Sequence, residues 1–118
     1  HGAPFYLFLY ENEAEIRSLK PIFADMEANV VATAPADAPE FDFISRFFGP
    51  LSGIPEDPVT GSAHTALAPF WAARLGKTSM TARQVSERGG TLRLSVVGER
   101  VMISGPATLY MEGVVYVQ

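Results

Sequence analysis

The chain contains no cysteine among its 118 residues. Disulfide bonds, thiolate metal ligands and thiol catalysis are therefore all excluded. Histidine is scarce as well, because His64 is the only one inside the chain, besides His1 at its start. A transition-metal site would have to consist of carboxylates, so we expect no metal site.

Basic charge and long apolar runs are also in short supply. The chain has 9 basic against 13 acidic residues and a net charge of -4. It has no overall attraction for a nucleic-acid backbone or an anionic lipid surface, so we expect neither as a partner. No apolar run approaches the roughly 18 residues of a membrane span, and no basic region followed by an apolar stretch opens the sequence. We therefore expect a cytoplasmic protein.

What the chain does contain is enough apolar surface for a folded core. Hydrophobic residues make up 47% of it and charged residues 19%, unlike the composition of a disordered chain. The length suits one domain over residues 1–118, and no repeat or linker marks a second one.

Strand-like segments dominate the sequence pattern. Residues 5–10, 30–34 and 41–46 are aromatic-rich, β-branched or alternating, which predicts three strands. A helix is expected to begin after Asn12, with Glu15 as capping-box partner. Glycine turns separate four further short runs, as in an antiparallel meander: residues 84–87, 91–97, 100–104 and 107–117. About seven strands and one strongly apolar helix predict an α+β domain, in which a barrel-like, mostly antiparallel sheet is wrapped around a central helix.

The apolar helix follows a rigid loop. Three prolines and three glycines lie among residues 49–64, which fixes the course of the loop while its backbone can approach a ligand closely. The helix is expected over residues 62–75, with Gly76 as its C-terminal stop. It is apolar almost all round, so we expect the sheet to enclose it. Pro69 either bends this helix or separates its first turns as a segment of their own.

The start of this helix is the candidate site. Free backbone N–H groups and the positive end of the helix dipole favour an anion, so Gly61 and Ser62 are well placed to hold a carboxylate. Asp57 shortly precedes them and is a candidate for hydrogen bonding to the ligand or for handling a proton. An equally open alternative is that Asp57 and Thr60 only cap the helix and shape the turn.

Other motifs in this region fail on geometry. Asp57, Ser62 and His64 have the composition of a hydrolytic triad, but residues two apart on a helix do not face each other. Gly-Lys-Thr at residues 76–78 resembles the end of a phosphate-binding loop, yet it closes a helix instead of opening one. His64 itself fits a satisfied, partly buried histidine better than a catalyst.

Three segments together resemble one known family: Arg-Phe-Phe-Gly-Pro at residues 46–50, Gly-Ile-Pro-Glu-Asp-Pro-Val-Thr-Gly-Ser-Ala-His at residues 53–64, and Gln-Val-Ser-Glu-Arg-Gly-Gly at residues 84–90. They look like the C-terminal half of the PhzF-like family, the phenazine-biosynthesis isomerases related to diaminopimelate epimerase. Residues 92–113 resemble the end of the family's sequence, so nearly the whole chain is covered.

The resemblance implies two similar halves, each a barrel-like sheet around a helix, with the active site between the two helix N-termini. It implies isomerisation by proton transfer without a cofactor, in which a glutamate of the N-terminal half is the main acid/base. In this chain it implies that Asp57 is the catalytic, proton-relaying group. It also implies that Gly61 and Ser62, with Thr60 and His64, bind a small carboxylated metabolite. The related epimerases use one cysteine from each half, and that mechanism is excluded here.

No part of the sequence matches the N-terminal half. We therefore expect the chain alone to be inactive, and to need either that half or a second copy of itself in a homodimer. Two alternatives stay open. One is a stand-alone domain that binds an anion or small molecule without catalysis, and the other is a purely structural or oligomerising domain.

Overall fold

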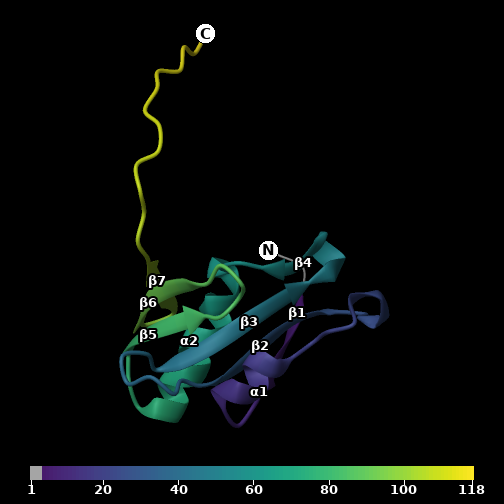
Figure 1. Ribbon diagram of the computed structural model, residues 1–118. Coiled ribbons are helices and arrows are strands. Elements are labelled where there is room, and N and C mark those ends of the chain that lie inside the picture. The colour runs from purple at the N-terminus through teal and green to yellow at the C-terminus, as the bar shows by residue number, and fades with distance from the viewer. Residues whose placement is uncertain (1–3) are drawn as a thin grey trace.

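The computed structural model describes residues 4–118, in which seven strands form one sheet (Figure 1). The elements in chain order are β1 (Phe5–Leu9), α1 (Glu13–Ser18), the 3-10 helix η1 (Phe23–Asp25), β2 (Asn29–Pro35), β3 (Phe43–Gly49), the 3-10 helix η2 (Pro50–Ser52), β4 (Ile54–Asp57), α2 (Gly61–Leu75), β5 (Ser79–Gln84), β6 (Gly90–Val97) and β7 (Arg100–Ser104).

The sheet is mixed because two of its strand pairs are joined through helices. The pairs β1–β2 and β3–β5 are parallel, and α1 and α2 supply the crossover connections that parallel pairs need. The remaining pairs are antiparallel, including the meander β5–β6–β7, of which the glycine turns predict the β6 and β7 strands. The strand order is β1-β2-β3-β5-β6-β7, with β4 on β3. The α+β class is confirmed, but within residues 4–118 the sheet is open, so the predicted closure into a barrel is not confirmed.

Two strand predictions are wrong and two strands, β4 and β5, are missed. The segment predicted as 84–87 shares only Gln84 with β5, which runs from Ser79 to Gln84. The segment 107–117 is not a strand: within residues 4–118 it pairs with no strand, and it extends away from the domain (Figure 1). β4 is missed because its proline indicates a loop, although an edge strand tolerates proline.

The helix starts are close to prediction. The side chain of Asn12 accepts a hydrogen bond from the backbone N–H of Glu15 at 2.9 Å, as an N-cap should. The Glu15 carboxylate reaches one residue further back than the capping box predicts, to the N–H of Glu11 at 3.2 Å. α2 begins one residue before the predicted start and ends at Gly76, whose φ of 66° suits a left-handed C-cap.

α2 is buried on one side only, which differs from the predicted enclosure. Its buried residues are Ala63, His64, Leu67, Ala68 and Trp71, and its opposite side is exposed. Pro69 lies on that exposed side and the helix runs through it as one element, so the first turns are not a separate segment. The apolar composition predicted enclosure, but the open sheet covers one side of the helix and leaves the apolar residues Pro69, Ala73 and Leu75 exposed.

Alternation along β2 and β3 produces two cores, one on each face of the sheet. Val31 and Phe43 join the residues of α2, while Ala32 and Ile44 pack with Ile16 of α1. Successive strand residues point to opposite faces, so α1 and α2 lie on opposite sides of the sheet (Figure 1).

Among residues 4–118, no helix has the length and the apolar composition that a membrane-spanning helix needs.

Candidate active site

The candidate site lies where two strands end on the same edge of β3. β5 runs parallel to β3 and ends with Gln84 opposite Ser45. β4 runs antiparallel to β3 and ends with Asp57 opposite Phe47. Both strands therefore finish side by side, and the chain turns there through residues 57–60 into α2. We call this segment the 57–60 turn.

Arg46, between those two pairing positions, fixes β4 in place. Its guanidinium donates to both carboxylate oxygens of Glu56, at 2.9 and 2.8 Å. It also donates to the carbonyls of Ile16 and Leu19 at the end of α1, both at 2.9 Å. A bidentate pair is directional and stronger than a neutral hydrogen bond. The residue before Asp57 is thus held firmly to the sheet.

The side chains of Asp57 and Thr60 bind each other rather than capping the helix. The Thr60 hydroxyl donates to Oδ2 of Asp57 at 2.6 Å. Thr60 occupies the N-cap position, yet its side chain makes no capping hydrogen bond. Among residues 4–118 no backbone N–H donates to the Asp57 carboxylate either. The helix start is therefore left uncapped by both residues, which argues against the capping alternative.

Gln84 joins this turn to β5, and the sequence reasoning assigned it no function. Its Oε1 accepts from the backbone N–H of Thr60 at 2.7 Å. Its Nε2 donates to the carbonyl of Asp57 at 2.9 Å and to the hydroxyl of Thr60 at 3.1 Å. Gln84 is 1% exposed. The signal that the sequence offers is that Gln84 is the first residue of the family-like segment 84–90.

His64 lies in the core beneath the turn. It is fully buried, and its Nδ1 lies 2.7 Å from the carbonyl of Thr60 while its Nε2 lies 3.4 Å from Oγ of Ser45. Because a carbonyl only accepts, Nδ1 carries the proton in the tautomer that this contact assigns. Burial lowers the pKa of His64, and the hydrogen bond to Thr60 opposes this with a smaller effect. This position favours the satisfied core histidine over direct contact with a ligand.

Gly61 and Ser62 present open backbone donors. Both residues are exposed, and in residues 4–118 neither of their N–H groups has a hydrogen-bond partner. A side chain added at Gly61 would meet nothing within 4 Å. The first turn of α2 contains no acidic residue, so no carboxylate of the helix itself compensates the positive end of the helix dipole. This arrangement can hold a carboxylate or another anion.

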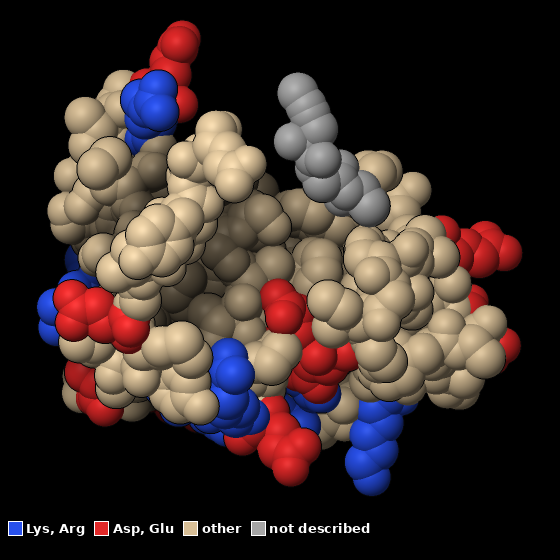
Figure 2. All heavy atoms as spheres, turned by 90° about the horizontal axis from the view of Figure 1, so that it is seen from above, with Lys and Arg blue, Asp and Glu red and all other residues tan. Residues whose placement is uncertain are grey.

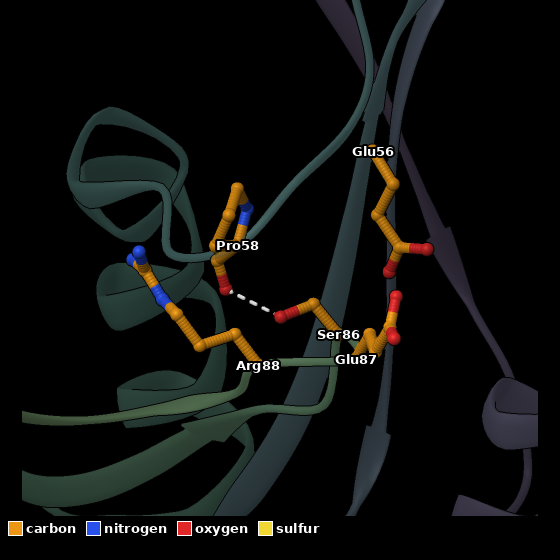
Figure 3. Close-up of a pocket in the computed structure, with 5 residues that line it drawn as sticks. All are labelled: Glu56, Pro58, Ser86, Glu87 and Arg88. Atoms are coloured by element: carbon orange, nitrogen blue, oxygen red, sulfur yellow. Dashed lines mark hydrogen bonds between the residues drawn. The ribbon is translucent and has the colours of Figure 1, made fainter.

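Two cavities flank the 57–60 turn. One has a volume of about 490 Å³ and is lined by Glu56, Pro58, Ser86, Glu87 and Arg88. Figure 3 shows the carboxylates of Glu56 and Glu87 pointing toward one another, and the Ser86 hydroxyl donating to the carbonyl of Pro58 at 2.7 Å. The second, of about 410 Å³, lies between Val59 and the β6–β7 end of the sheet. Seen from above, this face is hollowed and mostly uncharged, with charged side chains at the rim (Figure 2).

Potential metal ligands do not gather at this site. In the part of the chain that the structure describes, no group of three or more histidine, aspartate or glutamate side chains is arranged to hold a metal ion. Most polar atoms of the turn are directed at one another. The open groups beside it are the backbone donors of Gly61 and Ser62, which suit an anionic ligand, and Oδ1 of Asp57.

Comparison with known proteins places nearly the whole chain in one family. The profile of the phenazine biosynthesis-like proteins (PhzC-PhzF) matches residues 2–113. An uncharacterized isomerase of Pseudomonas aeruginosa is 50% identical over 115 residues, which is 94% of this chain and 44% of that protein. A phenazine biosynthesis-like domain-containing protein of Bos taurus is 53% identical over 74 residues, which is 62% of this chain and 26% of that protein.

Solved structures agree with the sequence comparison. A PhzC/PhzF protein from Clostridium difficile superposes with a TM-score of 0.82 at 36% identity, over 96% of this chain and 45% of that one. A PhzF-family protein from Enterococcus faecalis gives 0.82 at 40% identity, over 94% and 44% of the two chains. The chain thus spans less than half the length of these relatives.

Proposed function

The chain belongs to the phenazine biosynthesis-like (PhzC-PhzF) family, and from this premise we propose that it is the substrate-binding half of a cofactor-independent isomerase. The relatives include proteins named as isomerases. The reaction moves a proton between two positions of a small carboxylated metabolite, without net oxidation or reduction. Asp57 relays the proton, and Gly61 and Ser62 bind the substrate carboxylate.

One observation carries this proposal: a carboxylate of the 57–60 turn and two unpaired backbone donors at the start of α2 lie within six consecutive residues, 57–62. The N–H groups of Gly61 and Ser62 bind the substrate carboxylate and orient the carbon that loses its proton. Asp57 keeps one oxygen on Thr60, which leaves Oδ1 free to take or give a proton. Thr60 and His64 support this geometry from inside the turn.

The main acid/base of the reaction comes from outside this chain. We use the name companion half for the part of the relatives that the chain does not match. The relatives are more than twice as long as the matched segment, which supports a site built between two halves. We further propose that the companion half, or a second copy of this chain in a homodimer, covers the open side of α2 and completes a barrel-like enclosure. The cytoplasmic location stays a prediction.

A second candidate function uses the same groups without chemistry. The unpaired N–H groups at the start of α2 suit a stand-alone module that binds an anion or a small carboxylate. In that case Asp57 would only shape the turn, and its replacement would change neither a reaction nor the exchange of a ligand proton.

Solvent deuterium exchange distinguishes the two functions. The protein that contains both halves is incubated in deuterium oxide with a panel of small carboxylic acids, and NMR detects loss of a C–H signal. The isomerase exchanges a C–H proton of at least one panel member, and Asp57→Asn lowers the rate by about 100-fold or more. The proposal would be contradicted if no acid exchanged a C–H proton, or if the wild type and Asp57→Asn exchanged it at equal rates.

Gly61→Ala tests the binding part separately. The substitution meets nothing within 4 Å in the chain, so the fold tolerates it, but the added methyl narrows the approach to the N–H groups. We expect a several-fold higher KM with unchanged stability. Ser62→Ala is the matched control, since it keeps the backbone N–H and removes only the hydroxyl. An unchanged KM in Gly61→Ala would remove this helix start from the binding site.

A further inference from the structure

Gln84 is a buried polar side chain that the proposed reaction does not use directly. It comes from β5, while every group that it binds belongs to the 57–60 turn. It is 1% exposed, and in the described residues no buried side-chain polar atom lacks a partner. Burying an amide is costly unless its hydrogen bonds are satisfied. The burial of Gln84 therefore depends on its three hydrogen bonds to the 57–60 turn, and we ask what these hydrogen bonds do for the turn.

The orientation of the Gln84 amide follows from the chemistry of its partners. The backbone N–H of Thr60 can only donate, so the atom that faces it at 2.7 Å must be the amide oxygen. The carbonyl of Asp57 can only accept, so the atom that faces it at 2.9 Å must be the amide nitrogen. The two contacts are independent and require the same orientation. A flipped amide would lose both hydrogen bonds.

This orientation also sets the direction of the Thr60 hydroxyl. The nitrogen of Gln84 donates to Oγ1 of Thr60 at 3.1 Å, which makes Oγ1 an acceptor on that side. The hydroxyl has a single proton, and it is then directed to Oδ2 of Asp57 at 2.6 Å. One oxygen of the Asp57 carboxylate is thereby occupied by a donor. Oδ1 has no such partner among residues 4–118.

We propose that Gln84 is a positioning residue of this active site: it directs the Thr60 proton to Oδ2 of Asp57 and so makes Oδ1 the oxygen that exchanges protons with the substrate. This inference rests on the proposed function. Gln84 acts through Thr60 and touches neither the substrate nor the reacting proton. In the hydrogen-bond chain, Gln84 donates to Thr60 and Thr60 donates to Asp57. An apolar side chain of equal size in place of Gln84 would not impose this direction.

Three substitutions separate this directing effect from packing. Gln84→Glu keeps the shape, but it replaces the donating NH2 with an acceptor that competes for the Thr60 proton. Gln84→Met keeps the volume and removes all three hydrogen bonds. Thr60→Val keeps the shape and removes the hydroxyl, while Thr60→Ser restores the hydroxyl and serves as the conservative control.

The first readout needs no substrate. In the protein with both halves, carbon-13 NMR at about pH 7.5 compares the chemical shift of the Asp57 carboxyl between variants. We expect this signal to move in Gln84→Glu and in Thr60→Val, because the hydrogen bond that Thr60 donates to the carboxylate is weakened or lost. Thr60→Ser is expected to keep the signal of the wild type. An unmoved signal in Thr60→Val would overturn the inference, and Gln84→Met tests the effect of Gln84 where Gln84→Glu does not fold.

The second readout is a double-mutant cycle on kcat. Gln84→Met and Thr60→Val each lower kcat by about tenfold or more with little change in KM, and the double variant is expected to lose little beyond Thr60→Val alone. Full additivity would show that Gln84 acts only on packing and would overturn the inference. If the wild type turns over no panel acid, the proposed function fails. The carboxyl signal of Asp57 then still decides whether Gln84 directs the Thr60 proton.

Discussion

Thr60 uses all of its polar atoms to join three buried or half-buried side chains. Its N–H donates to Gln84, its hydroxyl donates to Asp57, and its carbonyl accepts from His64. A single residue thereby connects the proposed proton relay with the end of β5 and with the core beneath α2. The 57–60 turn is rigid for this reason, although it lies between regular elements.

The sequence could identify only those site residues that lie close together along the chain. Asp57, Gly61 and Ser62 lie within one short segment, and the structure brings them together at the start of α2. Gln84 and Ser45 lie far away in the sequence, and only the pairing of β3 with β5 brings them to the turn. Long-range pairing of this kind cannot be read from local residue patterns.

Because His64 is buried, we expect the folded chain to lose stability in mildly acidic solution. Burial lowers its pKa below the ordinary 6.5, so the unfolded chain takes up a proton more readily than the folded one. The stabilisation is fully present above about pH 6.5 and decreases as the pH falls, by up to about 1.4 kcal/mol per pH unit. Urea unfolding at about pH 7.5 and about pH 5.5 measures the difference.

Two variants test whether His64 causes this pH dependence of stability. His64→Gln keeps a side-chain donor but removes the titrating group, so its midpoint should change less between the two pH values. His1→Gln removes the other histidine of the chain and should behave like the wild type. A pH dependence as steep in His64→Gln as in the wild type would mean that another group carries it.

At the scale of the elements, the position of the site depends on how β4 is attached to β3. Arg46 of β3 binds Glu56 of β4 and the last carbonyls of α1, so three elements meet on one guanidinium. The sequence does not reveal this attachment, because Pro55 suggested a loop at the position where β4 forms an edge strand. α2 was easier to predict, since its loop, its apolar run and Gly76 are all local features.

Arg46→Lys is expected to destabilise the chain by about 1–3 kcal/mol. A lysine has no planar fork for Glu56 and cannot serve the carboxylate and both carbonyls together. The side chain of Arg46 is only 13% exposed, so water does not replace the lost hydrogen bonds. Chemical denaturation of the two proteins measures the difference in the free energy of unfolding.

Arg17→Lys is the matched control for this prediction. Arg17 also pairs with a glutamate, but its side chain is 57% exposed and it serves no helix-end carbonyl. An exposed ion pair contributes between zero and about 1 kcal/mol, so the control should change stability by less than about 0.5 kcal/mol. Equal losses in the two variants would show that Arg46 has no special function in holding β4.

At the scale of the whole molecule, apolar side chains remain exposed. Residues 107–117 extend away from the domain with Tyr110 and Tyr116 each at least 90% exposed (Figure 1), and Leu75 at the end of α2 is 41% exposed. Apolar side chains that gather on a surface are typical of a contact with another protein unit. Together with relatives more than twice as long, they support a molecule in which a companion half covers these surfaces.

Complementation tests this view directly. The 118-residue chain is expected to show no deuterium exchange with any panel acid by itself, because in the proposed function the main acid/base is supplied from outside it. Adding the companion half as a separate polypeptide should restore exchange and produce a one-to-one complex in sedimentation experiments. Asp57→Asn in this chain should form the same complex without restoring exchange, which separates assembly from chemistry. Exchange by the isolated chain, sedimenting as a monomer, would show that one half suffices; exchange only at the mass of a dimer would identify a second copy as the partner.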